Sequence, residues 1–162
     1  MSELVWSDGL LGEARQTLVD VAAALRSQGV DGVLELTGGT SVPGALTKGD
    51  IDLHLRVEAD AFSAVVVRLK AMYPVASAHS WAPTLAVFDI PARRPTGLAV
   101  TPIGSDHDQR FCLAWQALRH DPALLAEYNS LKTATAGTDD YERRKSAFFT
   151  TVADGAHHPP AE

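Results

Sequence analysis

Two neighbouring segments set the topology expected of this chain: GGTSVPG at residues 38–44 and DIDLHLRV at residues 50–57. Polar and apolar residues alternate throughout the second segment, which is typical of a β-strand whose two faces meet different surroundings. Another short strand pattern, GVLELT at residues 32–37, runs directly into the first segment, where glycine permits a sharp turn close to a ligand. We therefore expect two strands joined by a glycine-rich turn.

Helix and strand patterns continue on both sides of these segments. Apolar residues recur at intervals of three and four in residues 11–28 and again in residues 59–73, which predicts two amphipathic helices. Residues 84–90 and 98–101 are apolar, β-type segments separated by a region rich in proline and arginine, and we expect them to form a hairpin.

The last third of the chain has helical patterns only. Three helices are expected there, around residues 111–118, from residue 122 onward, and over residues 141–152. The order of elements predicts an α+β fold, with a mixed β-sheet of about four strands, helices packed on it and a helical C-terminal part. We expect one domain over residues 1–152 and a disordered tail over residues 153–162.

The composition is that of a globular protein, and it narrows the classes of partner. The chain has 162 residues, of which 46% are hydrophobic and 21% charged, so it can bury roughly 70% of the surface of its unfolded form. Its 14 Lys and Arg against 20 Asp and Glu leave a net charge of -6, which disfavours a long nucleic acid as partner. Neither a membrane span nor a signal-peptide pattern is evident, so we expect a cytoplasmic protein without a membrane partner.

The single cysteine limits the metal chemistry. Cys112 excludes an internal disulfide and any metal site built from several thiolates, because one sulfur supplies one ligand. Its apolar neighbours, Phe111 and Leu113, favour a role as a small buried hydrophobe.

Asp50 and Asp52 are the first candidates for function. They are two positions apart on a predicted strand, so both carboxylates leave the same face. Two such charges about 4 Å apart repel by roughly 4 kcal/mol at an effective dielectric constant of about 20, so they must be hydrated, protonated or bound to a cation. Hard oxygen ligands favour Mg²⁺ or Mn²⁺. Alone, an Asp-x-Asp pattern is also typical of the solvated face of an edge strand.

The glycine turn is the second candidate. Gly38 and Gly39 expose backbone amides, and Thr40 and Ser41 add hydroxyls, in a segment expected to start a short helical turn. An anion-binding turn beside a metal-binding carboxylate pair predicts a metal-bound di- or triphosphate as ligand.

Several other side chains have more than one interpretation. His54 shares the face of the two aspartates and is expected to be a polar strand position rather than a base or ligand. Trp115, with Phe111, is expected in the core rather than as a platform for a nucleotide base. Lys132 and Lys145 fit phosphate binding and ordinary helix-surface pairing equally well.

These motifs resemble a known family. Residues 38–44 and Asp50-Ile51-Asp52-Leu53 resemble the signature of the polymerase-beta-type nucleotidyltransferase superfamily, and within it the GrpB family. The similarity extends to RHDP at residues 119–122, to AEY at residues 126–128 and LK at residues 131–132, and to Tyr141 with KSAF at residues 145–148.

The resemblance implies a minimal nucleotidyltransferase fold, with a divalent metal on Asp50 and Asp52 and a nucleoside triphosphate at the glycine turn. A third carboxylate often completes the metal site in the superfamily, and Asp89 is the acidic candidate on the next predicted strand. The GrpB pattern often has histidines on the final strand, whereas this chain has GLAV at residues 97–100.

The expected activity is the metal-dependent transfer of a nucleoside monophosphate from a triphosphate to a small molecule or a protein. Gly38, Gly39, Thr40 and Ser41 would bind phosphate, while Lys132 and Lys145 would neutralise charge that metal ions and carboxylates leave unbalanced. Two alternatives stay open: a noncatalytic nucleotide-binding or regulatory module, and a metal-dependent phosphohydrolase or kinase-like enzyme. Acceptor, base preference and oligomeric state are not determined by the sequence.

Overall fold

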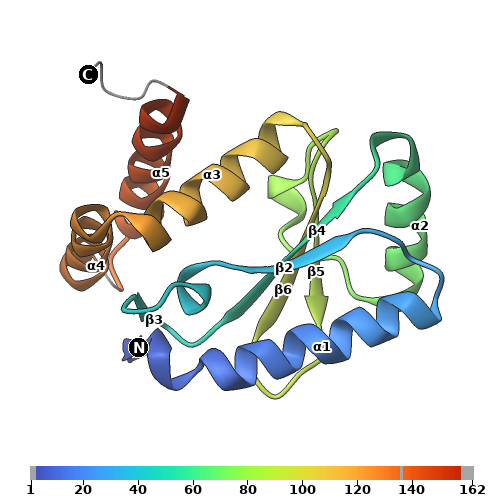
Figure 1. Ribbon diagram of the computed structural model, residues 1–162, viewed down its shortest axis with the longest axis horizontal. Helices are drawn as coiled ribbons and strands as arrows, with labels where there is room; N and C mark the ends of the chain where they lie inside the picture. The colour runs from blue at the N-terminus through green and yellow to red at the C-terminus, as the bar shows by residue number, and fades with distance from the viewer. Residues whose placement is uncertain (1–2, 136, 158–162) are drawn as a thin grey trace.

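A four-stranded mixed sheet is the centre of the computed structural model, which describes residues 3–135 and 137–157. The strand order is β2-β4-β6-β5, with β4 parallel to β6 and the two outer pairs antiparallel (Figure 1). The strands are β2 (Val33–Thr37), β4 (Ile51–Val57), β5 (Ala86–Ile90) and β6 (Thr96–Pro102). The expected mixed sheet and the β5–β6 hairpin are confirmed, and β4 is a central strand rather than an edge strand.

Helices cover both faces of this sheet. The apolar face packs against α1 (Leu11–Ser27) and against α2 (Phe62–Met72), which makes the crossover that parallel strands require. Opposite them, α3 (Asp106–His120) lies over the polar face and leads to α4 (Pro122–Thr135) and α5 (Tyr141–His157), as Figure 1 shows. None of the helices in the described part of the chain is both long and apolar enough to cross a membrane.

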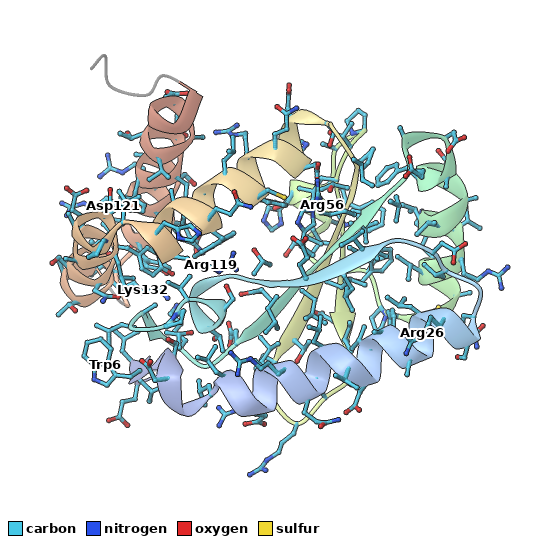
Figure 2. The ribbon with its side chains drawn as sticks, in the orientation of Figure 1. Trp6, Arg26, Arg56, Arg119, Asp121 and Lys132 are labelled. Atoms are coloured by element: carbon cyan, nitrogen blue, oxygen red, sulfur yellow. The ribbon has the colours of Figure 1, made fainter. Side chains whose placement is uncertain are left out.

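Packing of α3 turns the polar face of β4 into an interior. The His54 side chain is only 2% exposed, and its Nε2 lies 2.7 Å from the Thr101 hydroxyl. Arg56 donates to both carboxylate oxygens of Asp108 on α3, at 2.6 and 3.0 Å, and Figure 2 shows it between the sheet and this helix. His54 is a polar strand position, as expected, and it is buried because a helix with its own polar residues covers that position.

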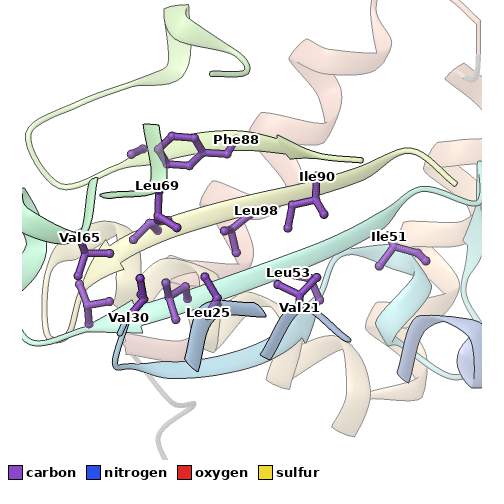
Figure 3. Packing of buried hydrophobic residues seen from close by; sticks show 14 of the residues in the cluster. Val21, Leu25, Val30, Ile51, Leu53, Val65, Leu69, Phe88, Ile90 and Leu98 are labelled. Carbon is purple, nitrogen blue, oxygen red and sulfur yellow. The ribbon is translucent and has the colours of Figure 1, made fainter. Parts of the chain in front are cut away.

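The apolar face supplies most of the core. The odd-numbered residues of β4, which include Leu53, are buried against side chains of α1, α2 and the neighbouring strands (Figure 3). Val21 and Leu25 of α1 and Leu69 of α2 occupy the positions that the helical periodicity predicts.

The ends of the chain differ from expectation. Helix α5 runs to His157, and Val152 and Ala153 are buried, so the tail expected to begin at residue 153 is helical through residue 157. The helix continues because its buried face includes these two side chains; residues 158–162 lie outside the described residues. The domain boundary at residue 152 stays a prediction.

The short strands β1 (Val5–Trp6) and β3 (Leu46–Thr47) were not expected, and they form a separate two-stranded sheet.

Truncation of Leu53 tests this core. Leu53 is 0% exposed, so we expect Leu53→Ala to lower the free energy of unfolding by about 2–5 kcal/mol, through lost burial and the cavity that remains. Val67→Ala on the outer face of α2, where the residue is 69% exposed, should change it by less than about 0.5 kcal/mol. Urea titrations followed by circular dichroism measure both, and equal losses would contradict this assignment of the core.

Candidate active site around Asp52

Asp52 lies on β4 beside two glycines, and one of them, Gly38, has no room for a side chain. It is in register with Thr37 of β2 and with Gly97 of β6. A Cβ atom added at Gly38 would meet the Asp52 carboxylate, with Cγ only 2.9 Å away, and one added at Gly97 would lie 3.5 Å from Oδ1. Gly38 also has a φ of +73°, which L side chains rarely adopt. The carboxylate therefore occupies space that two glycines leave open.

The two carboxylates lack partners within the protein. Burial raises the pKa of Asp52, and the negative charge of Asp50 raises it further, while Lys145 and Lys132 oppose the shift. No hydrogen bond or ion pair within the described ranges reaches the carboxylate of either aspartate. Asp50 is exposed, whereas Asp52 is half-buried and its charge is disfavoured by burial, so a cation bound at Asp52 would relieve an unfavourable charge.

Lysines from the C-terminal helices face the aspartates. Lys132 on α4 is 6% exposed, and its Nζ lies 5.0 Å from the centroid of the Tyr128 ring. Burial lowers the pKa of Lys132 to about 8, and the nearby charge of Lys145 on α5 acts in the same direction. Neither lysine Nζ comes within 4.0 Å of an aspartate oxygen in the described structure. Cations and anions thus face each other without pairing.

Tyr141 stands between further charges of the site. The Nζ atoms of Lys48 and Lys145 lie 4.8 and 5.6 Å from the centroid of its ring. Burial raises the pKa of Tyr141 to about 12, with smaller contributions from the negative charges of Glu142, Asp50 and Asp52. The phenol is therefore neutral at physiological pH, and its ring lies beside two ammonium groups.

Hydroxyl groups give the glycine turn its shape. Residues Gly39–Ser41 form a 3₁₀ turn, as expected. The Thr40 hydroxyl bonds to the Asp50 carbonyl and lies 3.0 Å from the Thr47 hydroxyl, while the Ser41 hydroxyl donates to the Gly38 carbonyl at 2.7 Å. The first amides of such a turn have no intrahelical acceptor, so they are the groups best placed for an anion. Phosphate binding at Gly38, Gly39, Thr40 and Ser41 stays a prediction.

Helices α3 and α4 hold this turn in place. Arg119 donates through Nη2 to the Leu36 carbonyl at 3.1 Å and to the Ser41 hydroxyl at 3.0 Å. Asn129 accepts from the Leu46 amide at 2.8 Å and donates to the Gly44 carbonyl at 2.9 Å. Figure 2 shows Arg119 and Lys132 reaching from the helices toward the turn. The sequence motif at residues 119–122 pointed to Arg119 but not to its function as a clamp.

Helix α4 leaves no room for a side chain at Gly39. A Cβ atom there would lie 2.9 Å from the Tyr128 hydroxyl and 3.1 Å from Lys132 Nζ. The Tyr128 ring is itself buried in an aromatic cluster with Trp115, Phe148 and Phe149. The AEY motif at residues 126–128 therefore supplies the surface against which the glycine turn rests.

A cavity of about 470 Å³ opens beside Asp52, within the range of small-molecule sites. Its wall includes Gly97 and Ala99 of β6, Phe111 and Trp115 of α3, and Lys145 of α5. The Trp115 ring also packs 4.9 Å from that of Phe149, centroid to centroid. The interpretation of Phe111 and Trp115 as core residues is therefore incomplete, because both also line the cavity.

Asp89 lies farther from the pair than a third metal ligand would. It is on β5, in register with Gly97, which is in register with Asp52, so two strand spacings, about 10 Å, separate the two backbones. Asp89 is exposed and does not line the cavity. Its role as third carboxylate stays a prediction, and the structure does not bring it together with Asp50 and Asp52.

Solved structures with this arrangement of strands and helices identify the fold. A structure of the GLD-2/RNP-8 complex has a TM-score of 0.57 at 13% identity, over 95% of this chain and 61% of that chain. The Cid1 poly(U) polymerase with MgGTP bound has a TM-score of 0.52 at 14% identity, over 75% of this chain and 41% of that chain. The fold is that of the polymerase-beta-type nucleotidyltransferases.

Family membership follows from the sequence comparison. A family model described as GrpB protein matches residues 12–154, so the chain belongs to the GrpB family. A UPF0157 protein of Vibrio cholerae serotype O1 is 28% identical over 142 residues, which cover 85% of this chain and 72% of that protein. The conserved protein GrpB from Enterococcus faecalis has a TM-score of 0.72 at 18% identity, over 95% of this chain and 96% of that chain. The resemblance in the motifs is confirmed.

Substitution of Gly38 tests its contact with Asp52. We expect Gly38→Ala to lower the free energy of unfolding by at least about 1 kcal/mol more than Gly104→Ala. Both glycines have positive φ, but a Cβ at Gly104 meets nothing within 4 Å. Equilibrium unfolding in urea measures the difference, which should shrink when both substitutions are repeated with Asp52→Gly, because this change also removes the Asp52 Cβ atom that lies 2.9 Å from the added methyl group. A difference that persists in that background would show that another contact restricts Gly38.

Proposed function

We propose that this GrpB protein is a Mg²⁺-dependent nucleotidyltransferase that moves a nucleoside monophosphate from a triphosphate to a small-molecule or protein acceptor. The observation that carries the proposal is the separation of charge around Asp52. Asp50 and Asp52 face Lys132 and Lys145 across the glycine turn without pairing. A metal-bound triphosphate matches this pattern, because it presents cations to the carboxylates and phosphate oxygens to the lysines.

The residues around Asp52 fit a hard divalent cation. Asp50 and Asp52 supply carboxylate oxygens, the ligands that Mg²⁺ and Mn²⁺ prefer. Both carboxylates are free of protein hydrogen bonds in the part of the chain that the structure describes. The cavity beside Asp52, whose wall includes Gly38 and Gly97, gives water and phosphate oxygens room to complete the coordination.

The protein groups divide the proposed reaction between them. Asp50 and Asp52 would hold the metal, which supplies charge stabilisation at the α-phosphate and lowers the pKa of the attacking hydroxyl. Lys132 and Lys145 would bind the β- and γ-phosphates, together with the first amides of the Gly39–Ser41 turn. The cavity beside Asp52 would orient nucleotide and acceptor and limit access of water, which favours transfer over hydrolysis.

A second candidate is a nucleotide-binding module without catalysis. Gly97 supports it, because this residue stands opposite Asp52 on the parallel strand β6, where a third carboxylate would be a close neighbour. The fold and the phosphate-binding groups would still permit nucleotide binding. A phosphohydrolase is the third possibility, since metal-bound phosphates do not determine the acceptor.

Nucleotide titration and product analysis discriminate these functions. We expect thermal stabilisation by at least one of ATP, GTP, CTP and UTP only when Mg²⁺ is present, followed by release of pyrophosphate when an acceptor is supplied. Candidate acceptors are amines, alcohols and the proteins of a cell extract, with radiolabelled nucleotide as tracer. Binding without turnover would support the module, and orthophosphate would support the phosphohydrolase.

Removal of both carboxylate charges should abolish the metal dependence. We expect Asp50→Asn with Asp52→Asn to bind nucleotide equally well with and without Mg²⁺, as measured by calorimetry. The fold should persist, because burial disfavours the charge at Asp52 and asparagine is neutral. Asp31→Asn with Asp60→Asn makes the same change in net charge at exposed positions and should behave as the parent does. Parent-like metal-dependent binding in the site variant would overturn the proposed role of the carboxylates.

Lys132 provides a separate test of phosphate binding. We expect Lys132→Met to weaken binding of the Mg²⁺-triphosphate complex by about 10- to 150-fold, because a hydrogen bond to a charged group contributes about 1.5–3 kcal/mol. Binding of the nucleoside without phosphates should be unchanged. Lys70→Met removes a lysine that contacts Trp81 on the other side of the sheet, and it should leave both affinities unchanged. An equal loss for nucleoside and triphosphate would instead indicate damage to the cavity.

A further inference from the structure

A second group of potential metal ligands lies under α3, apart from the aspartate pair. Glu35 on β2 and His54 on β4 are directly opposite each other in the antiparallel register, and Cys112 reaches them from α3. One ligand atom from each of the three residues lies within 4.8 Å of the other two. Three elements distant in sequence therefore bring a carboxylate, an imidazole and a thiol together.

A small cavity is present at this point. Its volume is about 20 Å³, and its wall includes Glu35, His54 and Cys112 together with Gln116 and Arg119. A space of roughly 10–15 Å³ is enough for one water molecule, so this cavity has room for one ion or one water. Its size and lining match a site for a single small ligand.

Hydrogen bonds determine which nitrogen of His54 faces this cavity. Arg56 binds the Asp108 carboxylate, which accepts hydrogen bonds only, so the Thr101 hydroxyl donates to Asp108 Oδ1 at 3.3 Å. That hydroxyl must then accept from His54 Nε2–H, which leaves a lone pair on Nδ1.

His54 Nδ1 is the unpartnered atom of a buried side chain. No hydrogen bond to it occurs among the described residues, and none of their fully buried polar side-chain atoms lacks a partner. Nδ1 is therefore not fully enclosed by protein, and His54 lines the small cavity together with Glu35 and Cys112. The lone pair is available to a ligand there.

We propose that Glu35, His54 and Cys112 form a site for a divalent transition metal of borderline softness, and that the bound ion is Zn²⁺. Carboxylate oxygen, imidazole nitrogen and thiolate sulfur together suit Zn²⁺ and disfavour Mg²⁺. Three protein ligands leave one coordination position for water, as in open zinc sites. The site is distinct from the proposed Mg²⁺ site, and it does not depend on the proposed transferase activity.

The charge and geometry of the three side chains are compatible with bound Zn²⁺. Glu35 and a Cys112 thiolate balance a divalent cation, while the charge of Arg56, 3.8 Å from Glu35, is already compensated by Asp108. Tetrahedral zinc with Zn–S of about 2.3 Å requires ligand atoms roughly 3.5 Å apart. The Glu35 side chain is 45% exposed and can make the short movement needed. Thr101 then acts as the outer partner that orients the metal-bound histidine.

Cobalt substitution tests the proposal directly. We expect metal-free protein to bind one Co²⁺ with a thiolate-to-cobalt charge-transfer band in the near ultraviolet and the intense visible bands of a tetrahedral centre. Addition of Zn²⁺ should displace Co²⁺ and so abolish both the charge-transfer band and the visible bands. The titration uses a background with His157→Ala and His158→Ala, because that histidine pair is an alternative ligand. Spectra that disappear in this background, or that lack the charge-transfer band, would overturn the proposal.

Variants locate the site. Cys112→Ser should lose the charge-transfer band, and Glu35→Gln should retain it with Co²⁺ affinity at least 10-fold weaker; both positions are only partly buried, so folding should persist. Glu127→Gln, at an exposed carboxylate on α4, is the matched control and should bind as the parent does. Asp50→Asn with Asp52→Asn should keep the full spectrum, which separates this site from the transferase site. A band that survives Cys112→Ser, or parent-like affinity in Glu35→Gln, would contradict the assignment.

Discussion

The burial of an acidic side chain in the middle of the sheet is the constraint on which the rest of this structure depends. Asp52 is on a central strand, and burial raises the pKa of its carboxyl. The carboxylate fills the space that a side chain at Gly38 would occupy, and it lies in van der Waals range of a Cβ atom added at Gly97. No protein donor in the described ranges bonds to it, so the protein has space around this charge without compensating it. Such an arrangement is unfavourable for stability alone and is expected at functional sites.

Neighbouring positions on β4 show that this burial is selective. His54 and Arg56 share the face of Asp52, yet each has a hydrogen-bonding partner, Thr101 for the imidazole and Asp108 for the guanidinium. The Arg56–Asp108 pair attaches α3 to the sheet, and the His54–Thr101 pair joins β4 to β6; among the described residues, no fully buried side-chain nitrogen or oxygen lacks a partner. Asp52 differs because its cross-strand neighbour is glycine. One strand thus contributes both to the attachment of α3 and to the candidate site.

The sequence predicted the β4 segment well and its surroundings poorly. Strict alternation from residue 50 to residue 57 indicates a strand with two distinct faces, and the structure confirms it. The same alternation arises whether the polar face meets water or a helix with matching polar groups, so the burial of His54 could not be predicted. The residue that attaches the covering helix, Asp108, is 52 residues from its partner Arg56 and lies in a helix whose sequence indicates only amphipathicity. Register is likewise non-local, which is why the distance between Asp89 and Asp52 did not follow from the motifs.

Placing the lysines on late helices couples the candidate site to folding. Lys132 and Lys145 reach the glycine turn only when α4 and α5 pack on it, and burial lowers the pKa of Lys132 while it raises that of Asp52. Each shift disfavours the charged form, so the ligand-free fold carries two unfavourable burials of opposite sign. A ligand that brings a cation to the aspartate and an anion to the lysine relieves both at once, and it binds only to the folded chain. For the proposed metal-bound triphosphate, binding would raise the free energy of unfolding once its concentration exceeds the dissociation constant, and this stabilisation would require the metal and the phosphates together. A protein selected for stability alone would replace both groups with apolar residues, so their retention in one interior is the physical argument for a charged ligand.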